Sequence, residues 1–302
     1  MNIDMQECIE KQYSRYFIDS YIREAIQSNP DVQDKINQGI ILVNEYMNKT
    51  YSYESKNKRV SQLTGLDINK LVNDIFVGIA YCQREELFTS VTAQLASRLK
   101  FSDKADAIKT VAEIVAVLCL TDAFDILKPS KGSSLTVISR IPLSDELKVY
   151  IENTQYLPPM VCEPKELENN YSSGYLTHND SLILGKNNHH DGDICLDVLN
   201  KINKVQLRLD TEFLSTVEEE PTFELDTQAK KDQWINFKRQ SYEFYLLIAK
   251  ADNKFWLTSK VDKRGRIYHA GYQINPQGTA FKKSMIELAK EEIIDVPEQF
   301  RL

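Results

Sequence analysis

A glycine between two arginines marks the segment of this chain whose residue types are best suited to chemistry. The segment reads Asp262-Lys263-Arg264-Gly265-Arg266. Glycine lets a backbone approach a bulky ligand closely or adopt a positive φ angle. Arginine can bind phosphate oxygens through two parallel hydrogen bonds, which lysine cannot do. Because Asp262 can pair with one arginine and fix its rotamer, the segment is suited to binding an anion.

The residues that follow add aromatic and basic groups. Tyr268 and Tyr272 could pack against a sugar or a base. Residues 275–278 (NPQG) predict a tight turn into a helix whose first turns contain Lys282 and Lys283. A phosphate near the start of that helix would meet both amide donors and ammonium groups. The whole stretch is therefore predicted to be an anion-binding platform, and the alternative is a hairpin that carries solvated surface charges.

Charge is distributed unevenly along the 302 residues. The net charge of −7 argues against a nucleic-acid-binding protein, whose binding face is usually basic. Residues 254–290, however, have a local balance of +6, whereas residues 211–228 contain six acidic residues and no basic one. The positive charge is thus concentrated at the predicted platform, although a charged run can also be a solvated face.

Composition predicts a soluble cytoplasmic protein without a membrane partner. Hydrophobic residues make up 42% and charged residues 27%, as in ordinary globular domains. No apolar run approaches the roughly 20 residues that cross a bilayer, and the N-terminus is acidic where a signal peptide is basic. The five cysteines are scattered without a C-x-x-C pair, so we expect buried free thiols rather than a disulfide framework or a zinc site.

Hydrophobic periodicity predicts a fold of the α+β class that is mainly helical. Apolar residues recur every three or four positions in the segments 66–80 and 87–99, and a third helix is expected over 104–127. Residues 134–141 (SLTVISRI) alternate and are β-branched, which predicts a strand. These elements belong to a helical N-terminal domain that we expect over residues 1–155.

The second half of the chain is predicted to contain an irregular region, two helices and a hairpin. Proline and glycine interrupt the first part, which has one short strand candidate, SLILG. The hairpin strands KFWLTSKVD and RIYHAG flank the Arg264 to Arg266 turn, and a terminal helix starts at Thr279. The predicted regions are an irregular connection at 156–193, helices at 194–215 and 228–251 within a region 194–252, and the hairpin region 253–302.

Aromatic and basic residues of the second helix have less specific interpretations. Trp234, Phe237 and Phe244 are expected to lie in the core rather than to stack on bases. Lys238 and Arg239 could contact backbone phosphates, or could be solvated.

The stretch from Trp256 to Lys290 resembles the start of the palm in the single-subunit RNA polymerases of T-odd phages and mitochondria. The matching residues are Asp262, Gly265 and Arg266 of a D-x-x-G-R motif, then Tyr268, the NPQG turn at 275–278, Lys283 and the apolar segment MIELA, which the family has as a helix. About one inserted residue interrupts this match. The likeness extends over residues 156–290, where the region 194–252 resembles a shortened thumb; an ordinary helical hairpin is the alternative. The family's aromatic residue in the proline-rich segment is missing here.

The resemblance implies roles for the platform residues. In the family, the D-x-x-G-R strand lies against the template and the RNA–DNA hybrid. Arg266 would then contact the template or hybrid backbone, and Gly265 would allow the close approach. The implied template- and hybrid-binding set is Arg264, Gly265, Arg266, Tyr268, Lys282 and Lys283, with Asp262 as a structural brace.

The resemblance also implies that the bond-making site lies on another chain. Nucleotidyl transfer in this family uses two Mg²⁺ ions about 3.5 to 4 Å apart, held by carboxylates. The family's first catalytic aspartate comes many tens of residues after the motif, whereas this sequence ends 36 residues after Arg266. We therefore expect no catalytic or metal-binding residue here, no activity of the chain alone, and a partner subunit that supplies the Mg²⁺, the aspartates and the fingers. The two-chain polymerases of the phage N-four group have this arrangement, which implies a phage protein in the cytoplasm of a bacterial host, bound to template DNA and RNA transcript.

Two other interpretations stay open at the level of sequence. The chain could be a stand-alone nucleic-acid-binding or adaptor protein without a polymerase partner, or an N-terminal fragment of a longer polymerase. The acidic cluster with histidines at 189–193 (HHDGD) precedes the motif, and we expect a polar loop there rather than a metal site.

Overall fold

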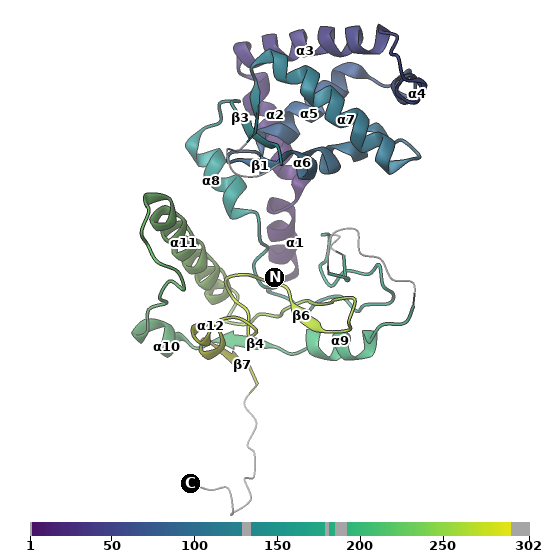
Figure 1. Cartoon of the computed structure of the whole chain (residues 1–302). Helices are drawn as coiled ribbons and strands as arrows, with labels where there is room; N and C mark the ends of the chain where they lie inside the picture. Colours follow the sequence, from purple (N-terminus) through teal and green to yellow (C-terminus); the bar gives the residue numbers. More distant parts are fainter. Residues whose placement is uncertain (1, 129–133, 179–180, 185–191, 291–302) are drawn as a thin grey trace, which may run out of the picture. The chain divides into compact units, whose positions relative to one another are not determined.

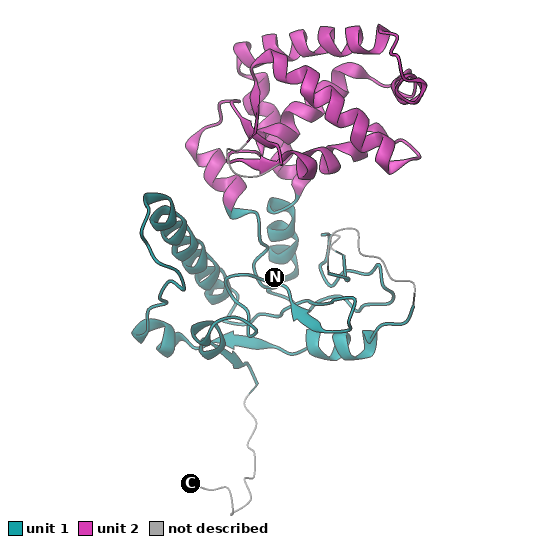
Figure 2. Ribbon diagram, in the orientation of Figure 1, with its two compact units in different colours: residues 1–14, 153–302 teal, residues 15–152 magenta. Residues whose placement is uncertain are grey.

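The computed structural model describes residues 2–128, 134–178, 181–184 and 192–290 and divides the chain into two compact units. Figure 2 shows unit 2, residues Arg15–Glu152, and unit 1, which combines Met1–Ser14 with Asn153–Leu302. The fold is α+β and mainly helical (Figure 1), which confirms the predicted class. Residues 1–14 thus belong to the same unit as the second half of the chain.

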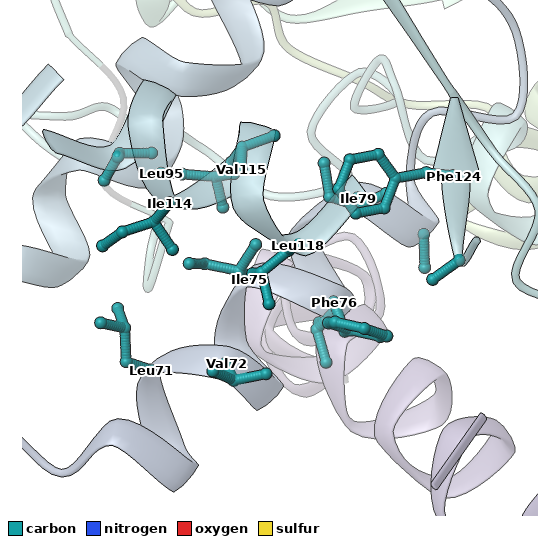
Figure 3. Packing of buried hydrophobic residues seen from close by; sticks show 14 of the residues in the cluster. Leu71, Val72, Ile75, Phe76, Ile79, Leu95, Ile114, Val115, Leu118 and Phe124 are labelled. Carbon is teal, nitrogen blue, oxygen red and sulfur yellow. The ribbon is translucent and has the colours of Figure 1, made fainter. Parts of the chain in front are cut away.

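Helix α5 (Ile68–Ala80) forms the centre of the hydrophobic core of unit 2. Its residues Ile75, Phe76 and Ile79 have no solvent exposure, and they pack with apolar residues of α6 and α7 (Figure 3). Full burial of such a side chain stabilises a fold by about 1.5–3 kcal/mol. The other helical elements of this unit are α2 (Arg15–Gln27), α3 (Pro30–Asn48), α4 (Glu54–Ser61), α6 (Phe88–Leu95), η1 (Ala96–Leu99), α7 (Lys104–Leu118), η2 (Cys119–Thr121) and α8 (Asp145–Asn153).

Side-chain caps fix where several of these helices begin. Asn29, Asp67 and Asp103 each accept a hydrogen bond from the backbone N–H three residues later, at the starts of α3, α5 and α7. Such a cap satisfies one of the four N–H groups that a helix start leaves without an internal partner.

The expectation of one helix over 104–127 is wrong in its last part. Helix α7 ends at Leu118, and Asp122 then takes a left-handed conformation with φ of 57°. Residues Phe124–Leu127 form β2, which pairs antiparallel with β3 (Thr136–Ser139), the strand predicted from SLTVISRI. With β1 (Glu86–Leu87) these strands form a sheet in the order β1-β3-β2, so a long-range pairing ends the helix.

In unit 1, helix α1 (Asn2–Gln12) is held by the carboxylate of Glu10. Its Oε1 accepts hydrogen bonds from Gln6 Nε2 (2.9 Å) and the N–H of Leu176 (2.8 Å). Its Oε2 accepts from the N–H of Thr177 (2.5 Å), the Thr177 hydroxyl (2.9 Å) and the N–H of His178 (2.9 Å). Burial acts to raise the pKa of Glu10, but the hydrogen bonds outweigh it and hold the pKa below its ordinary value. Glu10 therefore joins the first helix to the loop at 176–178.

Two segments of this unit that were predicted to be helical each contain a strand, and the two strands pair in one sheet. The segment expected as a helix over 194–215 is divided into α9 (Leu196–Asn203), β4 (Leu207–Leu209) and α10 (Thr211–Thr216). The expected terminal helix stops early, because α12 covers only Ala280–Ser284 and Ile286–Leu288 form β7. Both helical predictions are therefore wrong in part, including the one for MIELA.

The pairing of strand β4 explains why these segments are not helical throughout. It runs antiparallel to β7, with Arg208 opposite Glu287 at a side-chain distance of 2.8 Å. On its other side, Leu207 exchanges two backbone hydrogen bonds with Phe255, of 2.8 and 2.9 Å. Hydrogen bonds from two distant segments outweigh a local helical periodicity, which is a weak preference per residue.

The long helix α11 (Gln228–Lys250) confirms the prediction of a helix over 228–251. Its residues Phe244 and Ile248 are buried against Leu209, Phe255, Leu257, Ile274 and Met285, which form a core cluster. This cluster fixes α11 to the strands and loops that lead into the hairpin.

Two expectations from composition can be compared with the structure. All five cysteines are free, but only Cys82 and Cys162 are buried; Cys119 and Cys195 are half-buried and Cys8 is exposed, so the expectation of burial is wrong for these three. Among the described residues, none of the helices combines the length and the apolar character that crossing a bilayer requires.

Candidate nucleic-acid interface

The two arginines lie on the turn of a hairpin formed by β5 (Ser259–Val261) and β6 (Ile267–His269), which confirms the predicted strand pair. The N–H of Asp262 donates to the carbonyl of Arg266 (3.0 Å), and the N–H of Gly265 donates to the carbonyl of Asp262 (2.9 Å). Gly265 has a φ of +78°, and an added Cβ would meet no heavy atom within 4 Å. The turn therefore favours glycine because of its backbone conformation and not because space is short.

Asp262 organises this turn through both carboxylate oxygens. Its Oδ1 accepts from the backbone N–H groups of Arg264 (2.9 Å) and Arg266 (3.0 Å). Its Oδ2 lies 2.7 Å from Nε and 2.6 Å from Nη2 of Arg266, and 3.4 Å from the guanidinium of Arg264. One carboxylate thus holds the backbone of the turn and positions both arginine side chains.

The charges of this turn support one another. Desolvation acts to raise the pKa of Asp262, but hydrogen bonds from the backbone and guanidinium of Arg266 outweigh it, so this pKa is lowered. The hydrogen bond that Arg266 donates to Asp262 in turn raises the pKa of Arg266. Both groups are therefore charged at neutral pH, and Lys263 and Arg264 give the turn an excess of positive charge.

The guanidinium groups are accessible while their brace is not. The side chains of Arg264 and Arg266 are 70% and 53% exposed, whereas that of Asp262 is 16% exposed. The ring of Tyr268 lies 5.5 Å from the guanidinium carbon of Arg266, and its hydroxyl lies 3.5 Å from Asp262 Oδ2. The hairpin tip therefore presents two oriented guanidinium groups, a geometry that suits phosphate oxygens.

The NPQG turn supports one edge of the hairpin. The side chain of Gln277 donates to the carbonyl of Ile267 (2.9 Å) and accepts from the N–H of His269 (2.9 Å), as a neighbouring strand would do. Asn275 donates to the carbonyls of His269 (3.2 Å) and Gly271 (2.9 Å). These motif residues position the tip by bonding to the backbone of β6 and the residues after it.

The other edge of the hairpin is held by the segment 182–184. Leu184 donates to the carbonyl of Val261 (2.7 Å), and Val261 donates to the carbonyl of Leu182 (3.0 Å). Within the described residues 181–184, the predicted strand SLILG forms only an isolated parallel bridge, at Ile183. The hairpin is also anchored by a small core, which contains Leu167, Leu182, Ile183, Leu199 of α9 and Val261.

The two lysines of α12 lie in different environments. Lys283 is exposed. Lys282 is buried, its Nζ donates to the carbonyl of Tyr272 (2.6 Å), and it lies 4.9 and 4.6 Å from the ring centroids of Phe237 and Tyr272. Burial lowers the pKa of Lys282, although nearby Glu219 acts against this. The expectation that Lys282 binds nucleic acid does not fit this geometry, because its ammonium group is enclosed and has a partner inside the fold.

The aromatic residues of α11 divide between core and surface. Phe244 is buried, as expected. Trp234 and Phe237 are only half-buried, so the expectation of core positions is wrong for them. Their rings stack on each other at 5.4 Å with an interplanar angle of 18°, and Phe237 continues edge-on to Tyr272 at 5.6 Å. The helical periodicity gave the wrong answer because the side of α11 that carries Trp234 faces a polar segment and not the core.

That polar segment is the acidic stretch after α10, whose contact with α11 was not predicted from the sequence. Glu218 pairs with Lys238 at 3.2 Å, and Asp226 pairs with Lys230 at 2.7 Å. Arg239 is exposed. The run of acids at 212–226, followed at once by lysines in the helix, was the available signal.

A polar loop was predicted for the histidine and aspartate cluster at 189–193, of which residues 189–191 lie outside the described residues. Within the parts of the chain that are described, no group of three or more His, Cys, Asp or Glu side chains is arranged to hold a metal ion.

Sequence comparison gives one further finding. The chain is 29% identical over 150 residues to a protein of Gelasinospora sp. (strain G114) named as a probable DNA-directed RNA polymerase. The match covers 45% of this chain and 17% of that protein, so the chain corresponds to a small part of its relative. No protein-family model matches. The chain is thus distantly related to a DNA-directed RNA polymerase.

Proposed function

We propose that this chain is the template- and hybrid-binding part of an RNA polymerase of the phage T-seven-like, single-subunit type. In this proposal the hairpin tip lies against the backbone of the template strand or of the RNA–DNA hybrid. Arg264 and Arg266 bind phosphate oxygens, Gly265 gives the turn its shape, and Tyr268 and Lys283 contribute to the same surface. The distant relationship to a DNA-directed RNA polymerase supports the polymerase-related part of this proposal.

The observation that carries the proposal is the Asp262-braced turn. Ordering one long side chain on binding costs about 0.5–1.5 kcal/mol. An arginine that is already oriented avoids part of this cost. Asp262 provides this order for Arg266 with two contacts of 2.7 and 2.6 Å, and the side chain still has 53% of its surface in solvent. The alternative, a hairpin with solvated surface charges, does not require a carboxylate that also accepts from two backbone N–H groups of the turn.

We further propose that the two-metal site belongs to a partner chain, as in split polymerases of phage. The partner would carry the catalytic carboxylates, the Mg²⁺ ions and the fingers. This chain would complete the palm by holding the template and the hybrid in line with that site. Phosphoryl transfer depends mainly on positioning and charge stabilisation, so a chain that only positions nucleic acid can control the reaction.

The binding experiment compares Arg266→Ala with Arg140→Ala. Arg140 is a matched control, because it is also 53% exposed and lies 2.7 Å from a carboxylate, that of Asp125. Affinity for a labelled RNA–DNA hybrid would be measured at several salt concentrations. If Arg266 neutralises one phosphate, the plot of log affinity against log salt should be less steep for Arg266→Ala than for wild type, by about 0.9. Equal slopes for wild type and Arg266→Ala would refute the role of the hairpin.

The second experiment tests the partner chain. This chain is mixed with a candidate polypeptide that carries palm aspartates, and RNA synthesis and co-elution are measured for each chain alone and for the mixture. Synthesis only by the mixture supports the two-chain proposal, and fewer abortive products with Arg266 intact than with Arg266→Ala would place the hairpin on the hybrid. Hybrid binding without any partner that restores synthesis would instead indicate an adaptor protein.

A further inference from the structure

An acidic segment between α10 and α11 folds back along one side of α11, and Glu219 of this segment also lies near Lys238 of the helix. Asp226 pairs with Lys230 at 2.7 Å. Phe223 packs edge-on against Trp234, with a centroid distance of 6.4 Å and an interplanar angle of 88°. Glu218 pairs with Lys238 at 3.2 Å. The segment therefore runs antiparallel to the helix, with a carboxylate, an aromatic ring and a carboxylate in succession.

The helix residues that receive these contacts form one row. Lys230, Trp234 and Lys238 are four residues apart, and such residues are neighbours on one face of an α-helix. The row spans about 12 Å along the helix axis. A cation, an indole and a cation in this order match a single nucleic-acid strand, which offers a phosphate, a base and a phosphate.

The three groups that contact α11 are largely exposed, whereas the preceding helix α10 is firmly packed. The side chain of Glu218 is 81% exposed and that of Asp226 is 53% exposed, and exposed ion pairs contribute little. Phe223 is 37% exposed. By contrast, Phe213 of α10 packs on Phe281 of α12 at 5.3 Å. These three contacts can therefore be released while α10 stays in place.

We propose that Lys230, Trp234 and Lys238 form a binding surface for single-stranded nucleic acid, and that the acidic segment 218–226 occupies it as an internal mimic. The carboxylates of Asp226 and Glu218 stand in for phosphates and the ring of Phe223 stands in for a base. An incoming strand displaces the segment, and the exposed acids Glu220 and Glu224 add repulsion that a weakly bound strand must overcome. This goes beyond the proposed function, because it concerns a different surface from the hairpin tip and can hold or fail without it.

The test uses the full chain and a fluorescein-labelled oligo(dT) of about 12 nucleotides. Phe223→Ala loosens the segment without changing any charge, and Glu218→Gln/Asp226→Asn removes the two ion pairs. Each should raise the affinity about three- to thirtyfold, since each removes part of a competing contact set. The control Glu163→Gln/Glu168→Gln removes two exposed acids from a remote loop of unit 1, and should change the affinity less than about twofold because such charges are screened at physiological salt.

A second change separates the mimic from a general charge effect. Trp234→Ala introduced into the Phe223→Ala chain should remove about tenfold or more of the affinity, since a base can no longer stack. Circular dichroism checks that each variant is folded. The proposal is overturned if Phe223→Ala binds oligo(dT) no better than wild type, or if the control gains as much as Glu218→Gln/Asp226→Asn. The hairpin variant Arg266→Ala should keep the gain from Phe223→Ala, so a failure of either surface is recognised separately.

Discussion

Replacing Glu10 with glutamine should destabilise unit 1 and leave unit 2 as it is. The glutamine oxygen can still accept from the Thr177 and His178 groups, whereas its NH₂ group would face the N–H of Leu176 and the side chain of Gln6. Gln6 cannot compensate by turning over, because its own oxygen accepts from the N–H of Val161 at 2.9 Å. Two donors, the N–H of Leu176 and the side-chain amide of Gln6, are therefore left without this acceptor.

The magnitude follows from these contacts. A buried donor without a partner costs about 1–3 kcal/mol, and a hydrogen bond to a charged group contributes about 1.5–3 kcal/mol. Because such terms are not additive, we expect a total loss of about 2–4 kcal/mol. With a urea m-value of about 2 kcal/mol/M, the unfolding midpoint of unit 1 should fall by about 1–2 M.

Tryptophan fluorescence makes the assay selective. The chain has two tryptophans, Trp234 and Trp256, and both belong to unit 1. The control is Glu7→Gln, an exposed acid on the same helix, which should stay within about 0.5 kcal/mol of wild type. The idea would be refuted if Glu10→Gln and Glu7→Gln unfolded at the same urea concentration.

Acid provides an independent check with a definite sign. The pKa of Glu10 is lowered in the folded chain, so the carboxylate stabilises unit 1 fully above its unfolded value of about 4.3, and this contribution is lost as pH falls through the lower folded value. The stability difference between wild type and Glu10→Gln should therefore be constant near neutral pH and shrink below about pH 4. A difference that stayed the same down to pH 3 would show that the charge of Glu10 is not responsible.

Three further predictions concern the hairpin and its neighbours. Asp262→Ala should lower the affinity for an RNA–DNA hybrid about tenfold although it removes a negative charge, because the arginines lose their orientation; an increase would show that charge alone matters. Gly265→Ala should destabilise the hairpin by about 1–2 kcal/mol and Gly265→Asn by less, since asparagine tolerates a positive φ; hydrogen exchange of residues 259–269 measures both, and equal protection of the two variants contradicts the strain argument. Lys282→Ala should cost unit 1 about 1–3 kcal/mol in urea unfolding and leave the hybrid affinity of the folded chain unchanged. Lys283→Ala should instead lower the hybrid affinity and leave the stability of unit 1 unchanged.

The sequence by itself determined those features that depend on neighbouring residues. Apolar spacing predicted α5 and α11, alternation predicted β3, and the D-x-x-G-R residues predicted a turn between two strands. Each of these follows from backbone geometry within a few residues, such as the 3.6-residue period of a helix or the positive φ of Gly265. The charge asymmetry between 211–228 and 254–290 could also be read directly.

Only the tertiary structure decided what pairs with these elements. The segment MIELA reads as a helix, yet Ile286–Leu288 form a strand because β4 offers a hydrogen-bonding edge that lies far away in sequence. Lys282 and Lys283 are adjacent and alike in sequence, but the rings of Phe237 and Tyr272 enclose one and leave the other in solvent. Glu10 and Glu218 look equally like surface acids, and it is the fold that gives one a set of backbone donors and the other a lysine on α11. Burial and pairing depend on contacts between remote segments, and a local pattern carries no information about which segments will meet.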